Sequence, residues 1–243
     1  MSRLRLVGVG VGPGDPDLVT IKAVRVLQAA DLVLLPTMDV AAEGRAERTV
    51  RALVDHDRLQ RLHFALSERG DRARREAAWD AAGSTVVAAF DRGEATVAFA
   101  TIGDPNVYST FSYLAATVRR LVPAVEVTTV PGITAMQHLA SVAGVPLVEG
   151  EETLTLYPLT AGLAGYRDAL RRSDTVVAYK GGRHLPDLVD VLRDEGRLDT
   201  AVVGADLGLA GERVMAAADV GAAMPYLSTV LAPPGARKRG GRL

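Results

Sequence analysis

The segment GVGVGPGDPDLVT, residues 8–20, follows the apolar run Leu4–Val11, which predicts a buried strand. The next segment, Leu18–Ala30, carries apolar side chains at three- and four-residue spacing and therefore predicts a helix. A glycine-rich turn between a strand and a helix is typical of ligand-binding α/β folds. Its glycines indicate that the backbone turns tightly here or is approached closely by another group.

The turn lacks the composition of a phosphate-binding loop. In the dinucleotide-binding pattern G-x-G-x-x-G, the third glycine is replaced by Pro13 if the pattern begins at Gly8, and by Asp15 if it begins at Gly10. Pro13 and Pro16 have no N–H to donate, a carboxylate repels a pyrophosphate, and no Lys-Ser/Thr pair follows the turn. We therefore expect a neutral or cationic ligand here; the alternative is a strand-to-helix turn that binds nothing.

The rest of the first half alternates between apolar runs and helical patterns, which predicts a mostly parallel sheet covered on both faces. Further strands are expected at 31–36, 95–100 and 125–130, and helices at 44–57, 72–90, 107–120 and 133–143. After GVPLVEGEE the pattern changes, with strands in TLTLYPL, DTVVAYKGG, TAVVGADLG and MPYLSTVLAPP and helices at 166–172 and 185–195. We expect two α/β domains, residues 1–148 and 149–232, and a basic, disordered tail at 233–243.

Composition argues against several classes of protein. The net charge of −1 disfavours general nucleic-acid binding, and the absence of cysteine excludes disulfides and cysteine zinc sites. No apolar run approaches the ~20 residues that cross a bilayer, and the glycines within 8–14 interrupt any signal-peptide core. We therefore expect a cytoplasmic protein with neither a membrane nor a nucleic-acid partner. The four histidines have no metal-site spacing, so no metal is expected.

Two further glycine-containing loops follow predicted strands. They are TIGDPNVYSTFSYL at 101–114 and VPGITA at 130–135. In an open α/β sheet, ligands bind in the crevice outside the carboxyl ends of the strands. Three loops of this kind therefore predict one ligand cleft.

The segments VGVGPGDPDLVTIKA, GDPNVY and VPGITA together resemble the motifs of the tetrapyrrole methylases, which are S-adenosylmethionine (SAM)-dependent enzymes of sirohaem and cobalamin synthesis. The resemblance runs from about Leu4 to Val214. YSTFSYL, REAAWDAA, GVPLVEGEETLTLYP and YKGGRHLPDLVDVL are similar to the subgroup that methylates precorrin-2 at C20, and Pro36 stands where sirohaem-branch members usually carry an aspartate. HFAL, YKGG and VVGADLG depart from the subgroup pattern.

This resemblance implies a SAM-dependent precorrin-2 C20-methyltransferase that makes precorrin-3A in cobalamin synthesis. It implies two α/β domains of the tetrapyrrole-methylase type, a cofactor cleft between them and a homodimer. The alternatives are a cobalt-factor II C20-methyltransferase, a methylase of another ring position, a diphthine synthase, and a non-catalytic sensor of SAM or tetrapyrrole.

The resemblance also implies which residues contact the cofactor. It places these nine against SAM: Pro13, Ile102, Gly103, Asp104, Val107, Thr134, Ala135, Lys180 and Asp206. The Asp104 carboxylate would accept charge-assisted hydrogen bonds, and its alternative role is an Asx turn before Pro105. Thr134 has an alternative role as the N-cap of the following helix. Lys180 and Asp206 would act mainly through their backbone, near the adenine.

Precorrin-2 carries many carboxylates, so we expect a basic surface for it. Between Gly44 and Arg75, nine arginines (45, 48, 51, 58, 61, 69, 72, 74 and 75) stand against five acidic residues. Because arginine forks bind carboxylates bidentately, Arg45 and Arg48 are candidate substrate contacts, and Tyr108 is a candidate contact for the macrocycle. The alternatives are a solvated helix surface for the arginines and core packing for Tyr108. No residue is marked as the catalytic base.

Overall fold

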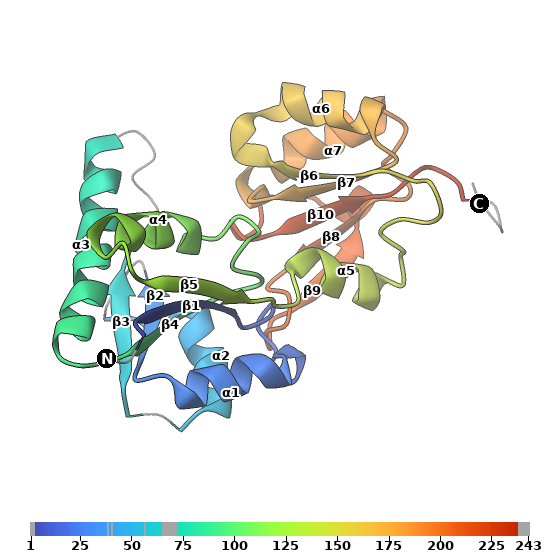
Figure 1. The fold of residues 1–243 in the computed structure, drawn as a ribbon. Coiled ribbons are helices and arrows are strands. Elements are labelled where there is room, and N and C mark those ends of the chain that lie inside the picture. The colour runs from blue at the N-terminus through green and yellow to red at the C-terminus, as the bar shows by residue number, and fades with distance from the viewer. Residues whose placement is uncertain (1–2, 38, 40, 56, 65–71, 238–243) are drawn as a thin grey trace. The chain divides into compact units, whose positions relative to one another are not determined.

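The computed structural model describes residues 3–37, 39, 41–55, 57–64 and 72–237. The chain divides into two compact units, Met1–Thr134 and Ala135–Leu243. Each unit contains one five-stranded sheet with helices packed on both faces (Figure 1). The prediction of two α/β domains is therefore confirmed.

The sheet of the first unit is wholly parallel and has the strand order β3-β2-β4-β1-β5. Its strands are β1 (Arg5–Gly10), β2 (Leu32–Thr37), β3 (Leu59–His63), β4 (Thr96–Thr101) and β5 (Glu126–Val130). Because β1 lies between β4 and β5 and all three strands are parallel, their carboxyl ends are neighbours at the same end of the sheet. The loops that follow them are the three predicted ligand-binding segments.

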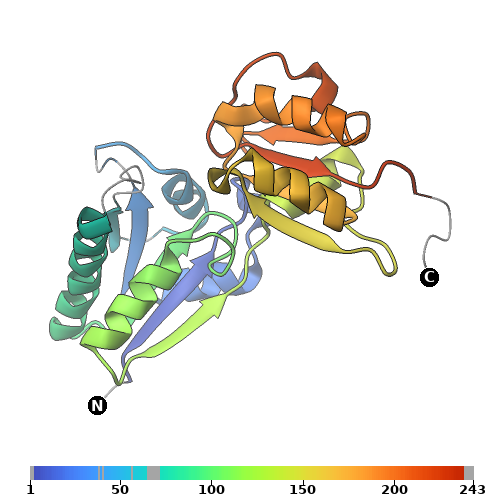
Figure 2. The same ribbon diagram turned by 90° about the horizontal axis from the view of Figure 1, so that it is seen from above.

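Helices cover both faces of this sheet because successive residues of each strand point to opposite sides (Figure 2). They are α1 (Ile21–Ala29), α2 (Arg45–Leu53), α3 (Arg72–Asp91) and α4 (Phe111–Leu121), with a 3₁₀ turn, η1 (Pro16–Leu18), before α1. α3 and α4 pack on the face that buries Leu6 and Phe99. α1 and α2 pack on the face that buries Val7 and Val9. The first-half prediction of a parallel, doubly covered sheet is correct.

The sheet of the second unit is mixed, with the order β6-β7-β10-β8-β9. Its elements are α5 (Ala135–Ala143), β6 (Leu154–Pro158), η2 (Leu159–Ala161), α6 (Leu163–Arg172), β7 (Thr175–Tyr179), η3 (Gly182–His184), α7 (Leu185–Asp194), β8 (Val202–Ala205), β9 (Arg213–Ala216), η4 (Ala217–Asp219) and β10 (Thr229–Ala232). β6 and β7 are parallel, whereas β10 runs antiparallel to both β7 and β8. α6 and α7 cover one face and α5 covers the other.

Two strands, β3 and β9, are not predicted by the sequence. Both lie at the edge of a sheet, where only one neighbouring strand is present. In β3 only Leu62 is buried, and in β9 no residue is buried. The alternation of apolar and polar side chains that signals a strand is therefore weak in both segments.

The division between the units also differs from the sequence-based boundary at 148–151. The units separate between Thr134 and Ala135, so α5 belongs to the second unit. The reason is packing: Leu139 of α5 is fully buried in a cluster with Val177, Leu207 and Leu231 of the second sheet and its loops. A change of composition along the chain does not reveal this contact, so the sequence-based boundary lies too late in the chain.

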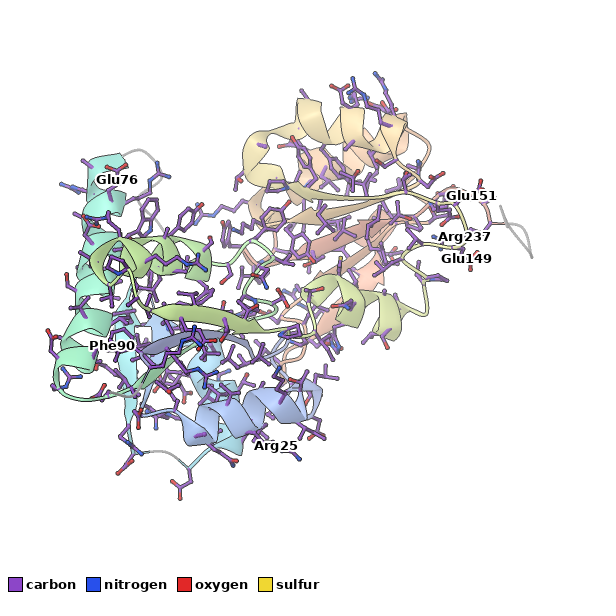
Figure 3. All side chains as sticks on the ribbon, in the orientation of Figure 1. Arg25, Glu76, Phe90, Glu149, Glu151 and Arg237 are labelled. Atoms are coloured by element: carbon purple, nitrogen blue, oxygen red, sulfur yellow. The ribbon has the colours of Figure 1, made fainter. Side chains whose placement is uncertain are left out.

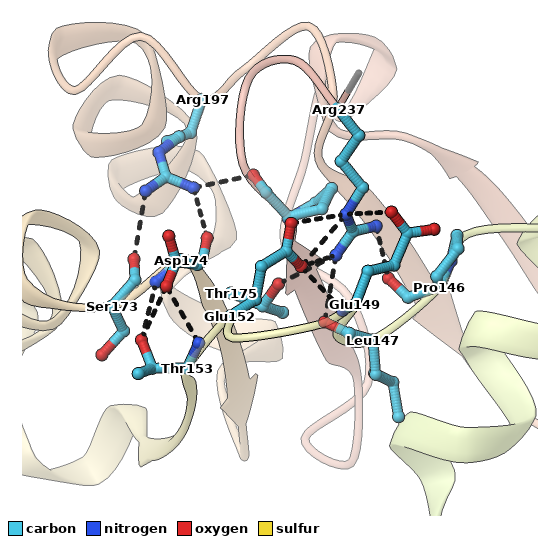
Figure 4. Close-up of polar contacts among 11 residues, drawn as sticks. Pro146, Leu147, Glu149, Glu152, Thr153, Ser173, Asp174, Thr175, Arg197 and Arg237 are labelled. Atoms are coloured by element: carbon cyan, nitrogen blue, oxygen red, sulfur yellow. Dashed lines mark hydrogen bonds and ion pairs between the residues drawn. The ribbon is translucent and has the colours of Figure 1, made fainter. Parts of the chain in front are cut away.

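The expectation of a disordered tail is wrong for its described part, 233–237. The Arg237 side chain, labelled in Figure 3, is only 16% exposed. It forms an ion pair with Glu152 at 2.7 Å (Figure 4). Its guanidinium also donates to the carbonyl oxygens of Pro146 at 2.7 Å and Leu147 at 3.2 Å. These bonds fasten the segment after β10 to the segment between α5 and β6. The remaining tail, 238–243, lies outside the described residues.

Candidate functional site

Three glycines bring the loops after β1, β4 and β5 into backbone contact; we call Gly10, Gly103 and Gly132 the glycine junction. A Cβ atom on Gly10 would lie 2.5 Å from the carbonyl oxygen of Gly103 and 2.6 Å from the amide nitrogen of Gly132. A Cβ atom on Gly132 would lie closer still to the same oxygen of Gly103. The Gly103 N–H donates to the carbonyl of Gly12 at 2.7 Å, which joins the first two loops. A side chain at Gly10 or Gly132 would force the loops apart, whereas Gly103 has room for a Cβ atom but has a left-handed φ of +69°.

The Asp104 carboxylate joins the second loop to the third. Its Oδ1 accepts from the N–H of Asn106 at 2.7 Å, which is the Asx turn offered as an alternative role. Its Oδ2 accepts from the N–H of Gly132 at 3.0 Å, a bond between loops that the sequence does not predict. Each carboxylate oxygen has a second lone pair, so these bonds leave acceptor capacity for a ligand.

A hydrogen bond from α2 holds the first loop. Thr49 is 1% exposed, and its hydroxyl donates to the carbonyl of Gly14 at 3.1 Å. Pro13, next to Gly14, is buried, and Gly12 has a φ of +73°. Thr49 was missed by sequence reasoning because a single threonine in an amphipathic helix carries no distinguishing pattern.

The second loop contains the candidate Tyr108. Its φ of +48° is in the left-handed region, which is costly for a residue with a bulky side chain. The side chain is 40% exposed, and partial burial raises the pKa of its hydroxyl. Ser109 follows, and its hydroxyl accepts from the N–H of Phe111 and shares a hydrogen bond with Thr101 at 3.1 Å. Tyr108 is thus a partly exposed side chain on a firmly held loop rather than a core residue.

Three further cofactor candidates, Ile102, Val107 and Thr134, lie in these loops, and Ala135 begins the second unit. Ile102 and Val107 are half-buried, and the N–H of Val107 donates to the carbonyl of Asp104 at 3.3 Å. Thr134 is 6% exposed and directly precedes α5, in the position of its N-cap. Ala135 is the first residue of α5 and is half-buried.

In the second unit, Lys180 and Asp206 occupy equivalent places. Each directly follows a strand, β7 or β8, and each has a left-handed φ, +62° for Lys180 and +52° for Asp206. Because β7 and β8 both run antiparallel to β10, their carboxyl ends lie at the same edge of the sheet. Within the described residues, Tyr108, Lys180 and Asp206 are the non-glycine residues with positive φ. Such strained backbone concentrates at functional sites.

The candidate arginines divide into two groups. Arg51 and Arg61 hold the carboxylate of Glu47, which is 1% exposed, at 2.8 and 2.7 Å. Burial opposes ionisation of Glu47, but the hydrogen bonds from both arginines outweigh it and lower the pKa of the carboxyl. Arg61 of β3 thereby joins β3 to α2, whereas Arg51 pairs with Glu47 within α2 itself.

Arg45 and Arg48 face a different environment. Arg45 is half-buried in the first turn of α2. Arg48 is 59% exposed, with a long contact of 3.4 Å to Glu43. Because this contact is long and the side chain is exposed, the Arg48 guanidinium is accessible to a ligand carboxylate. Arg69 and the side chain of Arg72 lie outside the described structure.

The electrostatic character of the three loops suits a cation. Residues 11–20, 101–110 and 131–134 contain three acidic side chains, Asp15, Asp17 and Asp104, and no lysine or arginine. A diphosphate would meet repulsion here, whereas a sulfonium or ammonium group would not. Among the described residues, no group of three histidine, aspartate or glutamate side chains is placed to hold a metal ion.

Sequence comparison finds relatives over nearly the whole chain. Residues 5–220 match the family described as Tetrapyrrole (Corrin/Porphyrin) Methylases. The chain is 36% identical to a precorrin-2 C(20)-methyltransferase of Sinorhizobium sp, over 94% of this chain and 95% of the relative. It is 29% identical to a cobalt-precorrin-2 C(20)-methyltransferase of Salmonella typhimurium, over 93% and 95%. It also matches the cobalamin biosynthesis protein CobIJ of Mycobacterium tuberculosis at 33% identity, over 98% of this chain but 47% of that protein.

Structural comparison finds the same fold in solved proteins. A cobalt precorrin-4 methyltransferase, CbiF, superposes with a TM-score of 0.70 at 20% identity, over 94% of both chains. A uroporphyrin-III C-methyltransferase from Thermus thermophilus, solved with S-adenosylhomocysteine, superposes with a TM-score of 0.65 at 21% identity, over 94% of this chain and 97% of that one.

Proposed function

The chain belongs to the tetrapyrrole (corrin/porphyrin) methylases, and on that basis we propose that it methylates precorrin-2 at C20, with SAM as methyl donor, in cobalamin synthesis. The observation that carries the proposal is the agreement, over nearly the whole chain, with relatives whose names state this activity. One of these relatives is named for the cobalt-containing substrate, so both forms of the ring belong in the test.

The geometry of the first unit supports SAM as the cofactor. Bound SAM supplies a methyl group activated by a positively charged sulfur. The glycine junction lets a ligand approach main-chain atoms, and the three loops offer carboxylate and carbonyl acceptors without a cationic side chain. Pro13, Ile102, Gly103, Asp104, Val107, Thr134, Ala135, Lys180 and Asp206 remain the proposed contacts.

The chain's own contribution to methyl transfer is chiefly positioning. C20 is an enamine-like carbon in a reduced tetrapyrrole and is already nucleophilic, so the protein has to hold it in line with the methyl group. Positioning of this kind is worth up to roughly 7–11 kcal/mol in favourable cases. Tyr108 is proposed to contact the macrocycle, and Arg45 and Arg48 its carboxylates.

The proposal also covers the cellular location and the oligomeric state of the protein. No described helix is long and apolar enough to cross a bilayer. A homodimer is proposed from the family resemblance, and a cytoplasmic location from the composition of the chain. Size-exclusion chromatography with light scattering tests the dimer, with the mass of two chains expected and the mass of one chain contradicting it.

The activity is tested by incubating purified protein with methyl-labelled SAM and either precorrin-2 or cobalt-factor II. We expect one labelled methyl group in the product by mass spectrometry, located at C20 by NMR. A label at another ring carbon would contradict the position. Tight SAM binding without label transfer to either ring would instead support a non-catalytic sensor, the alternative favoured by the departures near Tyr179 and Gly204.

A further inference from the structure

A histidine–glutamate pair lies beside one of the left-handed residues of the second unit. His138, on α5, and Glu212, just before β9, approach to 2.6 Å between Nε2 and Oε2. Their side chains are 12% and 27% exposed, so the contact is largely shielded from water. Neither residue has a role in the proposed function, and their separation in sequence gives no signal of the pairing.

The same carboxylate oxygen closes the turn that begins at Asp206. Oε2 of Glu212 accepts from the N–H of Gly208 at 2.7 Å. Within the turn, the N–H of Leu209 donates to the carbonyl of Asp206 at 3.0 Å, and the N–H of Glu212 donates to the carbonyl of Leu209 at 2.9 Å. Asp206 and Gly208 both have left-handed φ, +52° and +73°. One carboxylate thus ties a strained turn to a helix.

Burial and charge agree with this role. Burial opposes ionisation of Glu212, but the bonds from the Gly208 N–H and the His138 ring outweigh it and lower the pKa of the carboxyl. Leu207, inside the turn, is 5% exposed and packs in the same apolar cluster as Leu139 of α5. The turn is therefore anchored to α5 twice, by an apolar contact and by the His138–Glu212 pair.

We propose that His138 and Glu212 are positioning residues for the cofactor, because they hold the backbone of Asp206 in its left-handed conformation. This inference rests on the proposed function, which gives the Asp206 backbone to SAM. Loss of either partner lets the turn leave that conformation. The affinity for the cofactor then falls, while the rate of methyl transfer in the filled enzyme changes little, since neither side chain touches the reacting atoms.

The test measures S-adenosylhomocysteine binding by calorimetry to the full chain and to Glu212→Ala and His138→Ala. We expect each variant to bind about tenfold more weakly, the size of one lost hydrogen bond to a charged group. Because the two residues act as a pair, the double variant should bind S-adenosylhomocysteine no more weakly than the weaker-binding of the two single variants. His138→Gln and Glu212→Gln retain part of the bonding and should recover part of the affinity. In turnover assays, KM for SAM should rise and kcat should stay within about twofold.

Glu195→Ala is the matched control. Glu195 is 12% exposed and pairs with Arg167 at 3.0 Å and Arg171 at 2.8 Å in the same unit, away from the Asp206 turn. It should lower the unfolding temperature without changing the affinity. Unchanged affinity in folded Glu212→Ala and His138→Ala would overturn the positioning role alone. Failure of the unaltered chain to bind S-adenosylhomocysteine would overturn the proposed function and the positioning role with it.

Discussion

Gly10, Gly103 and Gly132 form the candidate site chiefly through main-chain atoms. The missing side chains of Gly10 and Gly132 let the three loops touch, and the Asp104 carboxylate bridges two of the loops. The close approach of the backbone at these loops was predictable, because glycine is the residue that such an approach requires. The bond from the Gly132 N–H to Asp104 was not, because it joins residues that are distant in sequence.

Gly132→Ala tests the junction at the scale of one residue. The new methyl group would overlap the carbonyl of Gly103, so the loops must move apart. We expect a loss of about 1–3 kcal/mol in the free energy of unfolding, the usual cost of overpacking, and little or no binding of S-adenosylhomocysteine. Gly221→Ala is the control, since a Cβ atom there meets nothing within 4 Å. Equal stability and binding in the two variants would show that the junction tolerates a side chain.

At the scale of elements, α3 and α4 cross where Gly83 meets Thr117. A Cβ atom on Gly83 would overlap the Thr117 methyl group, so the glycine sets how closely the helices pack. One turn away, Trp79 and Tyr113 stack with ring centroids 4.4 Å apart. The helix at 72–90 was predicted from the sequence, but this crossing was not. The predicted start of α4 at Val107 is wrong, because Tyr108 leaves the helical conformation.

Gly83→Ala gives an opposite result from the one that helix propensity alone predicts. Alanine in an exposed helix interior stabilises by about 1 kcal/mol relative to glycine. Here the overlap with Thr117 should outweigh that gain and lower the free energy of unfolding by about 1–3 kcal/mol. Adding Thr117→Ser removes the obstructing methyl group and should recover most of the loss, as a double-mutant cycle in urea would measure. Stabilisation by Gly83→Ala alone would refute the close crossing.

At the scale of the whole molecule, ion pairs join segments that are far apart in the chain. Glu47 binds Arg61, and Glu152 binds Arg237. Burial opposes ionisation of Glu47, but its hydrogen bonds to arginines lower the pKa of this carboxyl. The hydrogen bond from Arg237 lowers the pKa of Glu152 and outweighs the opposing effect of burial. The number of α/β domains was predictable from alternating patterns. The true boundary and the ordered Arg237 were not, because both depend on contacts across the sequence.

These lowered pKa values predict how stability depends on pH. A carboxyl whose pKa is lower in the folded state binds fewer protons there than in the unfolded chain, so its stabilisation is complete above the unfolded value near 4.5. It is lost as the pH falls through the folded pKa. We expect the unfolding temperature to drop steeply below about pH 5, as differential scanning fluorimetry would measure. Glu47→Gln should flatten that drop, whereas Glu43→Gln, at an exposed position, should not.

The three glycine loops are proposed to bind the sulfur-containing nucleoside that SAM and its product S-adenosylhomocysteine share, and not a dinucleotide. Titration calorimetry of the unaltered chain with S-adenosylhomocysteine and, separately, with NADPH tests it most directly. We predict a saturable heat with S-adenosylhomocysteine and none with NADPH. Saturable binding of NADPH without any heat from S-adenosylhomocysteine would contradict it.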